Sequence, residues 1–357
     1  MQGWIRNLTL ARKFMLVGLV ASMMLAIPSA IALRRMVGDM VFAQQEFAAL
    51  APVRAALRAV QLTQQHRGLS AALLAGNTAM APQREAKRNE VTQALDGLRA
   101  AVATLGDTAL DKQVAALAAD WAALAPVTAD KSTSSAENFA RHTRLVGAEI
   151  ELLEDITNTS GIVLHPEATG YFLQNGVLGR LPAVTEALGQ MRARGAAILT
   201  RGEASAEDKL FLSSLRREAA GELRNATKSM VLAWRDDPAI KTALERPVSA
   251  AAAGSEAVLK LMDERILDAR ALDYPAKDYF AAMTQAIDLQ FALIEAGLAA
   301  LDRNFSEANA RAQVNFGFIL GGILLLGGTA AGLLWAVAVS TTRAVREAVD
   351  LAAAVAE

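Results

Sequence analysis

The chain has 357 residues and a formal net charge of −1, and 53% of its residues are hydrophobic. It contains no cysteine, which excludes disulfides, thiolate metal sites and cysteine nucleophiles. A net charge near zero, without a basic patch interleaved with aromatic residues, argues against nucleic-acid binding. Because proline is scarce and aromatic residues make up only 5%, the composition favours long helices, and we predict an all-α fold.

The first apolar segment, residues 14–33, has no charged residue and follows a basic tail at residues 1–13. It is either a cleaved secretory signal, with Ala30-Ile31-Ala32 as the signal-peptidase site, or an uncleaved membrane anchor. A signal core usually has about 7–15 apolar residues, and about 20 suffice to span a bilayer. We therefore favour an anchor.

A second apolar segment, residues 312–342, is also free of charged residues. If both segments span the membrane, the two chain ends lie on the same side of it. Both ends are basic, through the tail at residues 1–13 and through Arg343 and Arg346. The positive-inside rule then places both ends in the cytoplasm and residues 34–311 in the periplasm of a bacterial inner membrane.

Small residues recur at every fourth position in both apolar segments, at Gly18, Ser22, Ala26, Ala30, Gly317, Gly321, Gly328 and Gly332. Such spacing lets helix backbones approach closely in lipid. It is either a chance result of an Ala/Gly-rich segment or the sign of a transmembrane bundle across a homodimer.

Between the apolar segments, eight helical runs are predicted, at about 35–76, 83–105, 109–126, 135–160, 168–202, 206–245, 248–270 and 276–311. The breaks are Gly76-Asn77, Leu105–Asp107, Thr128–Ser135, Arg201–Glu203, Arg246-Pro247 and Asp273–Pro275. Four plus four helices with short turns predict two stacked four-helix bundles, at about residues 34–162 and 163–311.

The last of these helices has one continuous apolar stripe with 3/4 spacing, formed by Phe280, Met283, Ile287, Phe291, Ile294, Leu298, Leu301 and Phe305. No Gly or Pro lies between Leu298 and Phe316, so we expect one helix to continue into the second apolar segment. Beyond it, residues 343–357 keep roughly heptad spacing of apolar residues.

Catalysis finds little support in the sequence. The three histidines, His66, His142 and His165, are far apart and form no metal-binding pair, and no nucleophile or phosphate-loop motif occurs. We predict neither an enzyme nor a metal or cofactor site.

A ligand site is more plausible on the first helical run. Gln64 and Arg67 share a helix face with Leu57, Val60, Ala71 and Leu74, whereas a second stripe of Leu62, Leu69 and Leu73 includes His66. Periodicity does not decide which face is buried. A buried guanidinium needs a partner, either a carboxylate of a neighbouring helix or a bound anion.

A similar segment recurs in the second half, where RARGAAILTRG is locally like HRGLSAALLAG. Arg192 flanks the apolar face of this later helix. An anion held between Arg67 and Arg192 is our hypothesis, with Gln64, His66 and Tyr171 as further candidate ligand-binding residues. Tyr171 follows a loop that begins at His165, and each of these two has an ordinary alternative role, in the core or in a turn.

The motif QQHRGLSAALLAG resembles the nitrate- and nitrite-sensing (NIT-like) type of helical sensor domain. SGIVLHPEATGYFLQNGVLGRLPAVTEALGQMRARGA and YFAAMTQAIDLQFALIE resemble segments of a related chemoreceptor subgroup, in which Asp-Pro-Asp stands where this chain has His165-Pro166-Glu167. AVSTTRAVREAVDLAAAVAE resembles the start of a HAMP linker, although it lacks the proline usual near Thr342. The resemblance implies a nitrate-type ligand, with Arg67 as its anchor.

Together these features predict the sensory half of a homodimeric methyl-accepting chemotaxis receptor. It would bind a small ligand, with an anion as the candidate, in the periplasm and act on cytoplasmic signalling proteins through an output domain beyond Glu357. The alternatives are the input half of a sensor histidine kinase or cyclic-nucleotide cyclase, and a membrane-anchored structural or adaptor protein without a ligand.

Overall fold

The computed structural model describes residues 8–126, 133–235 and 237–356, which form helices joined by short turns, with no β-strand among them. This confirms the predicted all-α class. The chain divides into two compact units: Gln45–Ser306 forms one, and Met1–Gln44 with Glu307–Glu357 forms the other. Most of the predicted break from Thr128 to Ser135 lies outside the described residues.

The first half of the chain contains α2 (Leu10–Leu74), η1 (Thr78–Met80), α3 (Ala81–Ala103), α4 (Thr108–Leu124), α5 (Ser135–Thr159) and η2 (Ile162–Leu164). The second half contains α6 (Ala168–Gln174), the π-helical turn η3 (Asn175–Arg180), α7 (Leu181–Arg201), α8 (Ala206–Ala233), α9 (Pro238–Met262), the π-helical turn η4 (Asp263–Leu267) and α10 (Ala276–Ala356).

Most of the predicted helix breaks are confirmed, because the residues at them have the required backbone chemistry. Gly76 and Gly202 have φ angles of 98° and 71°, in the left-handed region that favours glycine. At the start of α4, the Asp107 carboxylate accepts a hydrogen bond from the backbone N–H of Ala109 at 2.8 Å. This side-chain cap satisfies a donor that the helix itself leaves free.

The predicted break at Arg246-Pro247 is wrong, because Pro247 lies inside α9. The chain breaks before Pro238 instead, where Asp237 caps the helix by accepting from the N–H of Ala239 at 2.9 Å. An Asp-Pro pair is a strong start signal, since proline suits the first helical turn. The hydrogen bond that Pro247 cannot donate is outweighed by the burial of neighbouring apolar residues such as Val248.

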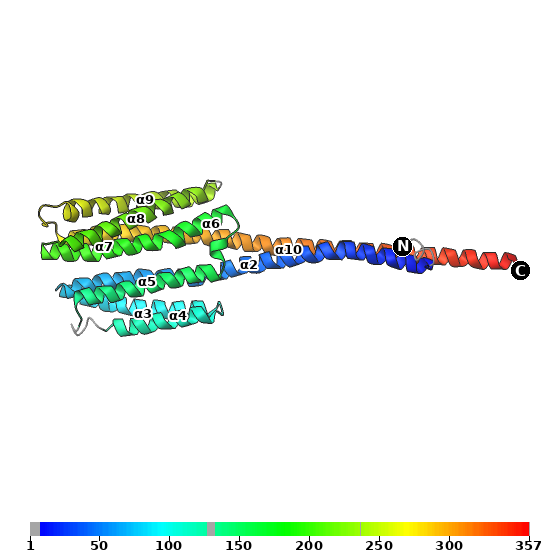
Figure 1. Cartoon of the computed structure of the whole chain (residues 1–357), viewed down its shortest axis with the longest axis horizontal. Coiled ribbons are helices and arrows are strands. Elements are labelled where there is room, and N and C mark those ends of the chain that lie inside the picture. Colours follow the sequence, from blue (N-terminus) through cyan, green and yellow to red (C-terminus); the bar gives the residue numbers. More distant parts are fainter. Residues whose placement is uncertain (1–7, 127–132, 236, 357) are drawn as a thin grey trace. The chain divides into compact units, whose positions relative to one another are not determined.

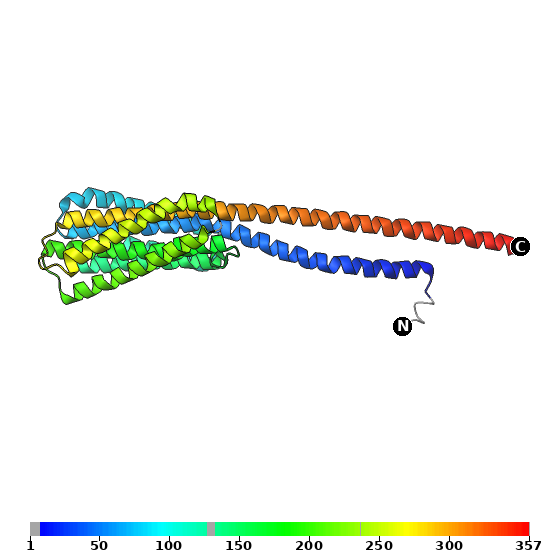
Figure 2. The same ribbon diagram turned by 90° about the horizontal axis from the view of Figure 1, so that it is seen from above.

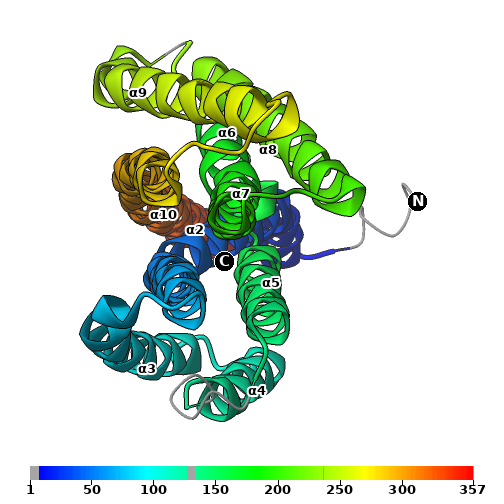
Figure 3. The ribbon, with the colours of Figure 1, turned by 90° about the vertical axis from the view of Figure 1, so that its left-hand side faces the viewer.

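Within the larger unit, the helices run alongside one another in two neighbouring groups (Figures 1 and 2). The end view in Figure 3 shows α3 and α4 at one side, α8 and α9 at the other, and α2, α5, α7 and α10 between them. The two groups lie side by side and share contacts along this middle layer. The predicted stacking of two separate four-helix bundles is therefore not confirmed.

The core of the larger unit is apolar and continuous across both groups. The predicted stripe on α10 is confirmed from Met283 to Phe305, whereas Phe280 at its start is only partly buried. Because α2 lies in the middle layer, both of its predicted faces are buried as far as Arg67 and partly buried beyond it. This explains why periodicity favoured neither.

The smaller unit consists of the first part of α2 and the last part of α10. Both helices have an apolar stretch long enough to cross a membrane, and its side chains are exposed. A Cβ atom at Gly18 would lie 3.9 Å from Leu334, an ordinary packing distance between the two helices. α10 continues as one helix of 81 residues, as we expected from the absence of Gly and Pro between Leu298 and Phe316.

Candidate anion-binding site

A buried ion pair joins α2 to α7 in the middle layer. The Arg67 guanidinium donates from Nη1 to Glu186 Oε1 at 2.6 Å and from Nη2 to Glu186 Oε2 at 2.9 Å. The Arg67 side chain is 1% exposed and that of Glu186 is 12% exposed. Two parallel charge-assisted bonds fix both distance and orientation, so the partner that Arg67 needs in the folded chain is a carboxylate.

Three neutral side chains complete the surroundings of this pair. Gln64 and Gln190 each donate an amide N–H to the Glu186 carboxylate, at 3.0 and 2.9 Å. Arg67 Nη1 also donates to the hydroxyl of Thr143 on α5 at 2.9 Å. The Glu186 carboxylate therefore sits within a ring of donors from α2 and α7.

The second arginine of the hypothesis, Arg192, lies in the same region and is 3% exposed. Its guanidinium donates to the backbone carbonyl of Gln64 at 3.1 Å and to the hydroxyl of Thr284 on α10 at 3.0 Å. It also lies 4.8 Å from the centre of the Phe280 ring, a favourable cation–π distance. Arg192 thus links α7 to both α2 and α10 without a carboxylate hydrogen-bond partner among the described residues.

Two glycines make room for the two arginines. A Cβ atom at Gly68 on α2 would lie 2.9 Å from Arg192 Nη2, and one at Gly189 on α7 would lie 2.8 Å from Arg67 Nη2. Each arginine therefore crosses the opposite helix where that helix has no side chain. The arrangement is reciprocal, and it brings both guanidinium groups between α2 and α7.

The two arginines and the acidic groups around them set the electrostatics of the site. Burial, together with the nearby charge of Arg67, lowers the pKa of Arg192 to about 10, so Arg192 is still protonated at neutral pH. Burial raises the pKa of Glu149, on α5 near the pair, to about 8, so this carboxyl group is neutral. Among the described residues, Arg67 and Arg192 then lie beside the Glu186 carboxylate, with Asp288 nearby at the exposed surface.

Several buried polar atoms in this region have no hydrogen-bond partner among the described residues. They are Gln64 Oε1, Arg67 Nε, Arg192 Nε and Glu149 Oε2. Unpaired buried polar atoms are rare in native proteins, so each of these four is a donor or acceptor that a bound ligand can use.

His66, a further predicted ligand residue, is buried on the other side of α2, against α4 and α5. Its Nδ1 lies 2.8 Å from Nε2 of His142, whose Nδ1 lies 2.8 Å from the carbonyl of Asn138. The Trp121 ring meets His66 edge-on at 4.8 Å. Burial lowers the pKa of His66 to about 2 and that of His142 to about 3, so both rings are neutral.

Tyr171, the last predicted ligand residue, lies apart from the two arginines. It is 42% exposed and lines a polar hollow of about 280 Å³ with Gln174 and Asn175. His165, at the start of the same loop, is buried against the Glu46 carboxylate on α2, with Nδ1 to Oε1 at 2.8 Å. The structure thus brings together Arg67, Gln64 and Arg192, but not His66 or Tyr171.

The sequence interpretation missed Glu186, Gln190, Thr143 and Glu149. Glu186 had a visible signal, because it is the only charged residue between Arg180 and Arg192. Thr143 and Glu149 lie on an amphipathic helix with many polar residues, which offered no comparable signal.

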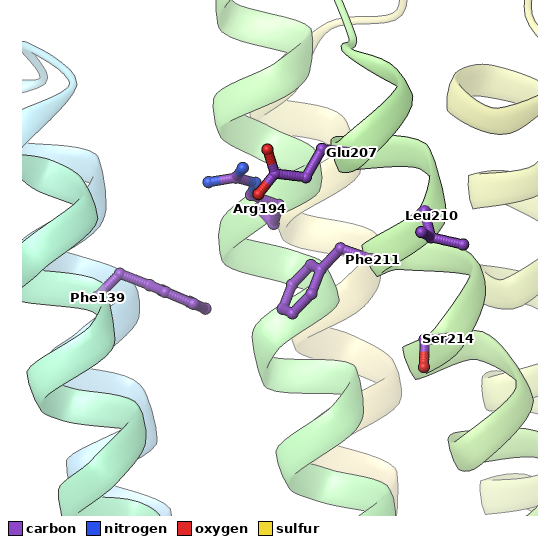
Figure 4. Close-up of a pocket in the computed structure, with 6 residues that line it drawn as sticks. All are labelled: Phe139, Arg194, Glu207, Leu210, Phe211 and Ser214. Carbon is purple, nitrogen blue, oxygen red and sulfur yellow. The ribbon is translucent and has the colours of Figure 1, made fainter.

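A larger hollow lies between α5, α7 and α8 (Figure 4). It measures about 460 Å³ and is lined by Phe139, Arg194, Glu207, Leu210, Phe211 and Ser214. The Phe139 ring, which extends into this hollow, also lies 5.4 Å from the Arg67 guanidinium. A single aromatic side chain thus adjoins both the hollow and the buried ion pair.

The two buried arginines on facing helices of this helical body offer donors that suit a small anion. Residues 58–301 match the model of the family described as nitrate and nitrite sensing (NIT). Because this match covers more than half of the chain, the chain belongs to the NIT family.

A solved structure described as the NasR transcription antiterminator is similar in fold, with a TM-score of 0.63. It is 18% identical, and the alignment covers 88% of this chain and 82% of that one. At this identity the likeness supports the fold alone. A comparison with curated proteins found no match.

Proposed function

We propose that this chain senses nitrate or nitrite, with Arg67 and Arg192 as the ligands of the anion. The observation that carries the proposal is the convergence of two buried arginines from α2 and α7, each crossing a glycine of the other helix. The NIT family membership names the anion class. Gln64, whose amide nitrogen and backbone carbonyl both belong to this cluster, is the third member of the site.

The chemistry of the site suits a small planar oxyanion. Nitrate and nitrite each present two oxygens in one plane, which matches the planar fork of a guanidinium. Burial strengthens such charge-assisted bonds, because the surrounding dielectric is low. Arg192, which donates only to neutral oxygens among the described residues, can pair with a monovalent anion.

The route of the signal follows from the contacts of Arg192. Its partner Thr284 belongs to α10, the helix that continues from the sensor unit to Ala356. An anion that draws Arg192 toward Arg67 changes this contact. We propose that α10 responds by a shift or rotation of about 1–2 Å, the scale of helix movements in other switches.

The proposal extends to a two-pass receptor of the bacterial inner membrane. In it, residues 14–33 and 312–342 span the membrane, residues 34–311 form the periplasmic sensor, and residues 343–357 begin a HAMP linker. The homodimeric chemotaxis receptor predicted from the sequence is its most specific form. The input half of a histidine kinase or cyclase, and an adaptor without a ligand, are the alternatives.

Calorimetric titration of the full chain in detergent with sodium nitrate and sodium nitrite tests the site, with sodium chloride at equal ionic strength as the reference. We expect saturable binding that Arg67→Lys and Arg192→Lys each weaken at least tenfold, since lysine cannot bind two oxygens in a plane. Arg58→Lys, at an exposed arginine of α2, is the matched control and keeps the wild-type affinity. Wild-type affinity in both Arg67→Lys and Arg192→Lys contradicts the assignment.

Topology is tested separately, by fusing alkaline phosphatase after residue 270 or after residue 357. The enzyme is active only after export, so we expect activity from the first fusion alone. Activity from the second fusion contradicts the placement of both chain ends in the cytoplasm.

A further inference from the structure

We infer that the Glu186 carboxylate is a built-in competitor for the anion, which occupies the Arg67 fork until the ligand displaces it. This inference rests on the proposed function, since it concerns the same guanidinium. It adds that the displacement of Glu186 from Arg67 sets the affinity of the site for the anion. It also names the event that ligand binding triggers, which is the release of a residue of α7 from a residue of α2.

The geometry of the pair carries the first step of the argument. Both Glu186 oxygens face Arg67, at 2.6 and 2.9 Å, so the carboxylate uses the fork as a bidentate ligand would. Gln64 and Gln190 supply two further N–H donors to the same carboxylate. A carboxylate and a nitrate ion both place two oxygens in a plane, so these four donors fit either group.

The exposure of the two partners carries the second step. Arg67 is 1% exposed, whereas the Glu186 side chain is 12% exposed and is thus the partner nearer to solvent. Glu186 can therefore move outward while the guanidinium stays in place. An anion that replaces it keeps the site's balance of charge, because one negative group exchanges for another.

The hydrogen bonds of the neighbouring Arg192 give the third step of the argument. Arg192 is bonded only to neutral oxygens, of Gln64 and Thr284, among the described residues. Glu186 therefore pairs with Arg67 alone, and the guanidinium of Arg192 can bind the incoming anion first. Displacement from Arg67 would let one anion contact both guanidinium groups, which a carboxylate anchored to α7 does not do.

Competition also predicts which anions bind. Planar monoanions with two in-plane oxygens, such as nitrate, nitrite and formate, reproduce the carboxylate that they replace. Tetrahedral sulfate does not, because its four oxygens do not lie in one plane. We expect the wild-type chain to discriminate at least tenfold against sulfate.

Glu186→Gln is the variant that tests the inference, in the full chain in detergent, by calorimetric titration with sodium nitrate. Glutamine keeps the size and the oxygen acceptor but removes the charge, so its hold on Arg67 is weaker. We expect nitrate to bind this variant at least tenfold more tightly than the wild type. Glu222→Gln, at a carboxylate paired with Arg180 outside the site, is the matched control and keeps the wild-type affinity.

The outcomes separate this inference from the proposed function. Tighter binding by Glu186→Gln supports the inference, and equal or weaker binding in a wild type that binds nitrate overturns it alone. If only Glu186→Gln binds nitrate, the competitor is supported and the wild-type sensor is overturned. If neither binds, both are overturned.

Glu186→Ala provides a second test if Glu186→Gln does not fold, as judged by circular dichroism. This variant leaves the Arg67 fork open to an anion from solution. We expect sodium formate to raise its thermal unfolding midpoint more than that of the wild type, relative to sodium chloride. An equal rise in both proteins overturns the inference.

Discussion

The hydroxyl of Thr63 on α2 donates to the Glu149 carboxyl group on α5 at 2.7 Å, and both side chains are completely buried. Burial raises the pKa of this carboxyl group to about 8, from an ordinary value of 4.5. At neutral pH the group is therefore protonated in the folded chain and ionised in the unfolded chain. Folding takes up a proton at Glu149, which links stability to pH.

The first prediction concerns this proton. Because the folded pKa is raised, the stability that depends on it is complete below about pH 4.5 and is lost as the pH rises through about 8. At about 1.4 kcal/mol per pKa unit, the loss between pH 5 and 9 is on the order of 4 kcal/mol. We expect Glu149→Gln to flatten the dependence of the thermal unfolding midpoint on pH over this range.

Glu151→Gln, an exposed position on the same helix, is the control and should keep the wild-type pH profile. A Glu149→Gln profile as steep as that of the wild type would show that Glu149 does not bind the proton.

The second prediction concerns acid. The pKa values of His66 and His142 lie far below the ordinary 6.5, so the stability linked to them is complete above about pH 6.5 and is lost as the pH falls toward 3. Two such groups give a slope of up to about 2.7 kcal/mol per pH unit. His142→Gln should halve this slope between pH 6 and 4, measured by thermal unfolding. An unchanged slope would exclude the pair as its origin.

The third prediction concerns the crossing points of the arginines. Gly68→Ala places a Cβ atom 2.9 Å from Arg192 Nη2, and Gly189→Ala places one 2.8 Å from Arg67 Nη2. Each substitution pushes a guanidinium aside, so we expect nitrate affinity to fall at least tenfold in calorimetric titration.

Gly147→Ala on α5 is the control, because its Cβ atom meets no other atom of the described chain within 4 Å. It should keep the wild-type affinity and stabilise the helix by about 0.5–1 kcal/mol. The crossing points would lose their proposed role if all three variants bound nitrate equally.

The fourth prediction concerns the contact that leads to α10. Thr284→Val keeps the shape of the side chain but removes the oxygen to which Arg192 donates at 3.0 Å. Thr284 holds the Arg192 guanidinium in position for the anion, so the loss of this bond, worth about 0.5–1.5 kcal/mol, should decrease nitrate affinity roughly 2–10-fold. Thr284→Ser keeps the hydroxyl and should bind as the wild type does. Equal affinities of the valine and serine variants would contradict this role.

Much of the helical organisation was predictable, because local chemistry decides it. Gly76, Gly106 and Gly202 end segments with a positive φ, and these breaks lie where the sequence predicted them. Pro247 was misread, because the cost of a proline within a helix depends on tertiary packing that a local pattern does not contain.

The site was predictable only in part. Arg67 and Arg192 stood out as cations on apolar helix faces, and the structure places both in one cluster. The pairing of Arg67 with Glu186 joins residues 119 apart in sequence and depends on the register between two helices. No local pattern fixes that register. Tyr171 was also predicted as a ligand residue, but it lines a separate polar hollow away from the two arginines.

Because α10 is unbroken from Ala276 to Ala356, the number of residues in it fixes the direction of its later side chains about the helix axis as well as its length. Each residue of an α-helix turns the chain by about 100°. One residue inserted near Ser306 would therefore turn every later side chain of α10 by about 100°, whereas seven would restore its direction to within about 20°. Insertions of seven residues should preserve the output of the sensor, and insertions of one to three should alter or abolish it.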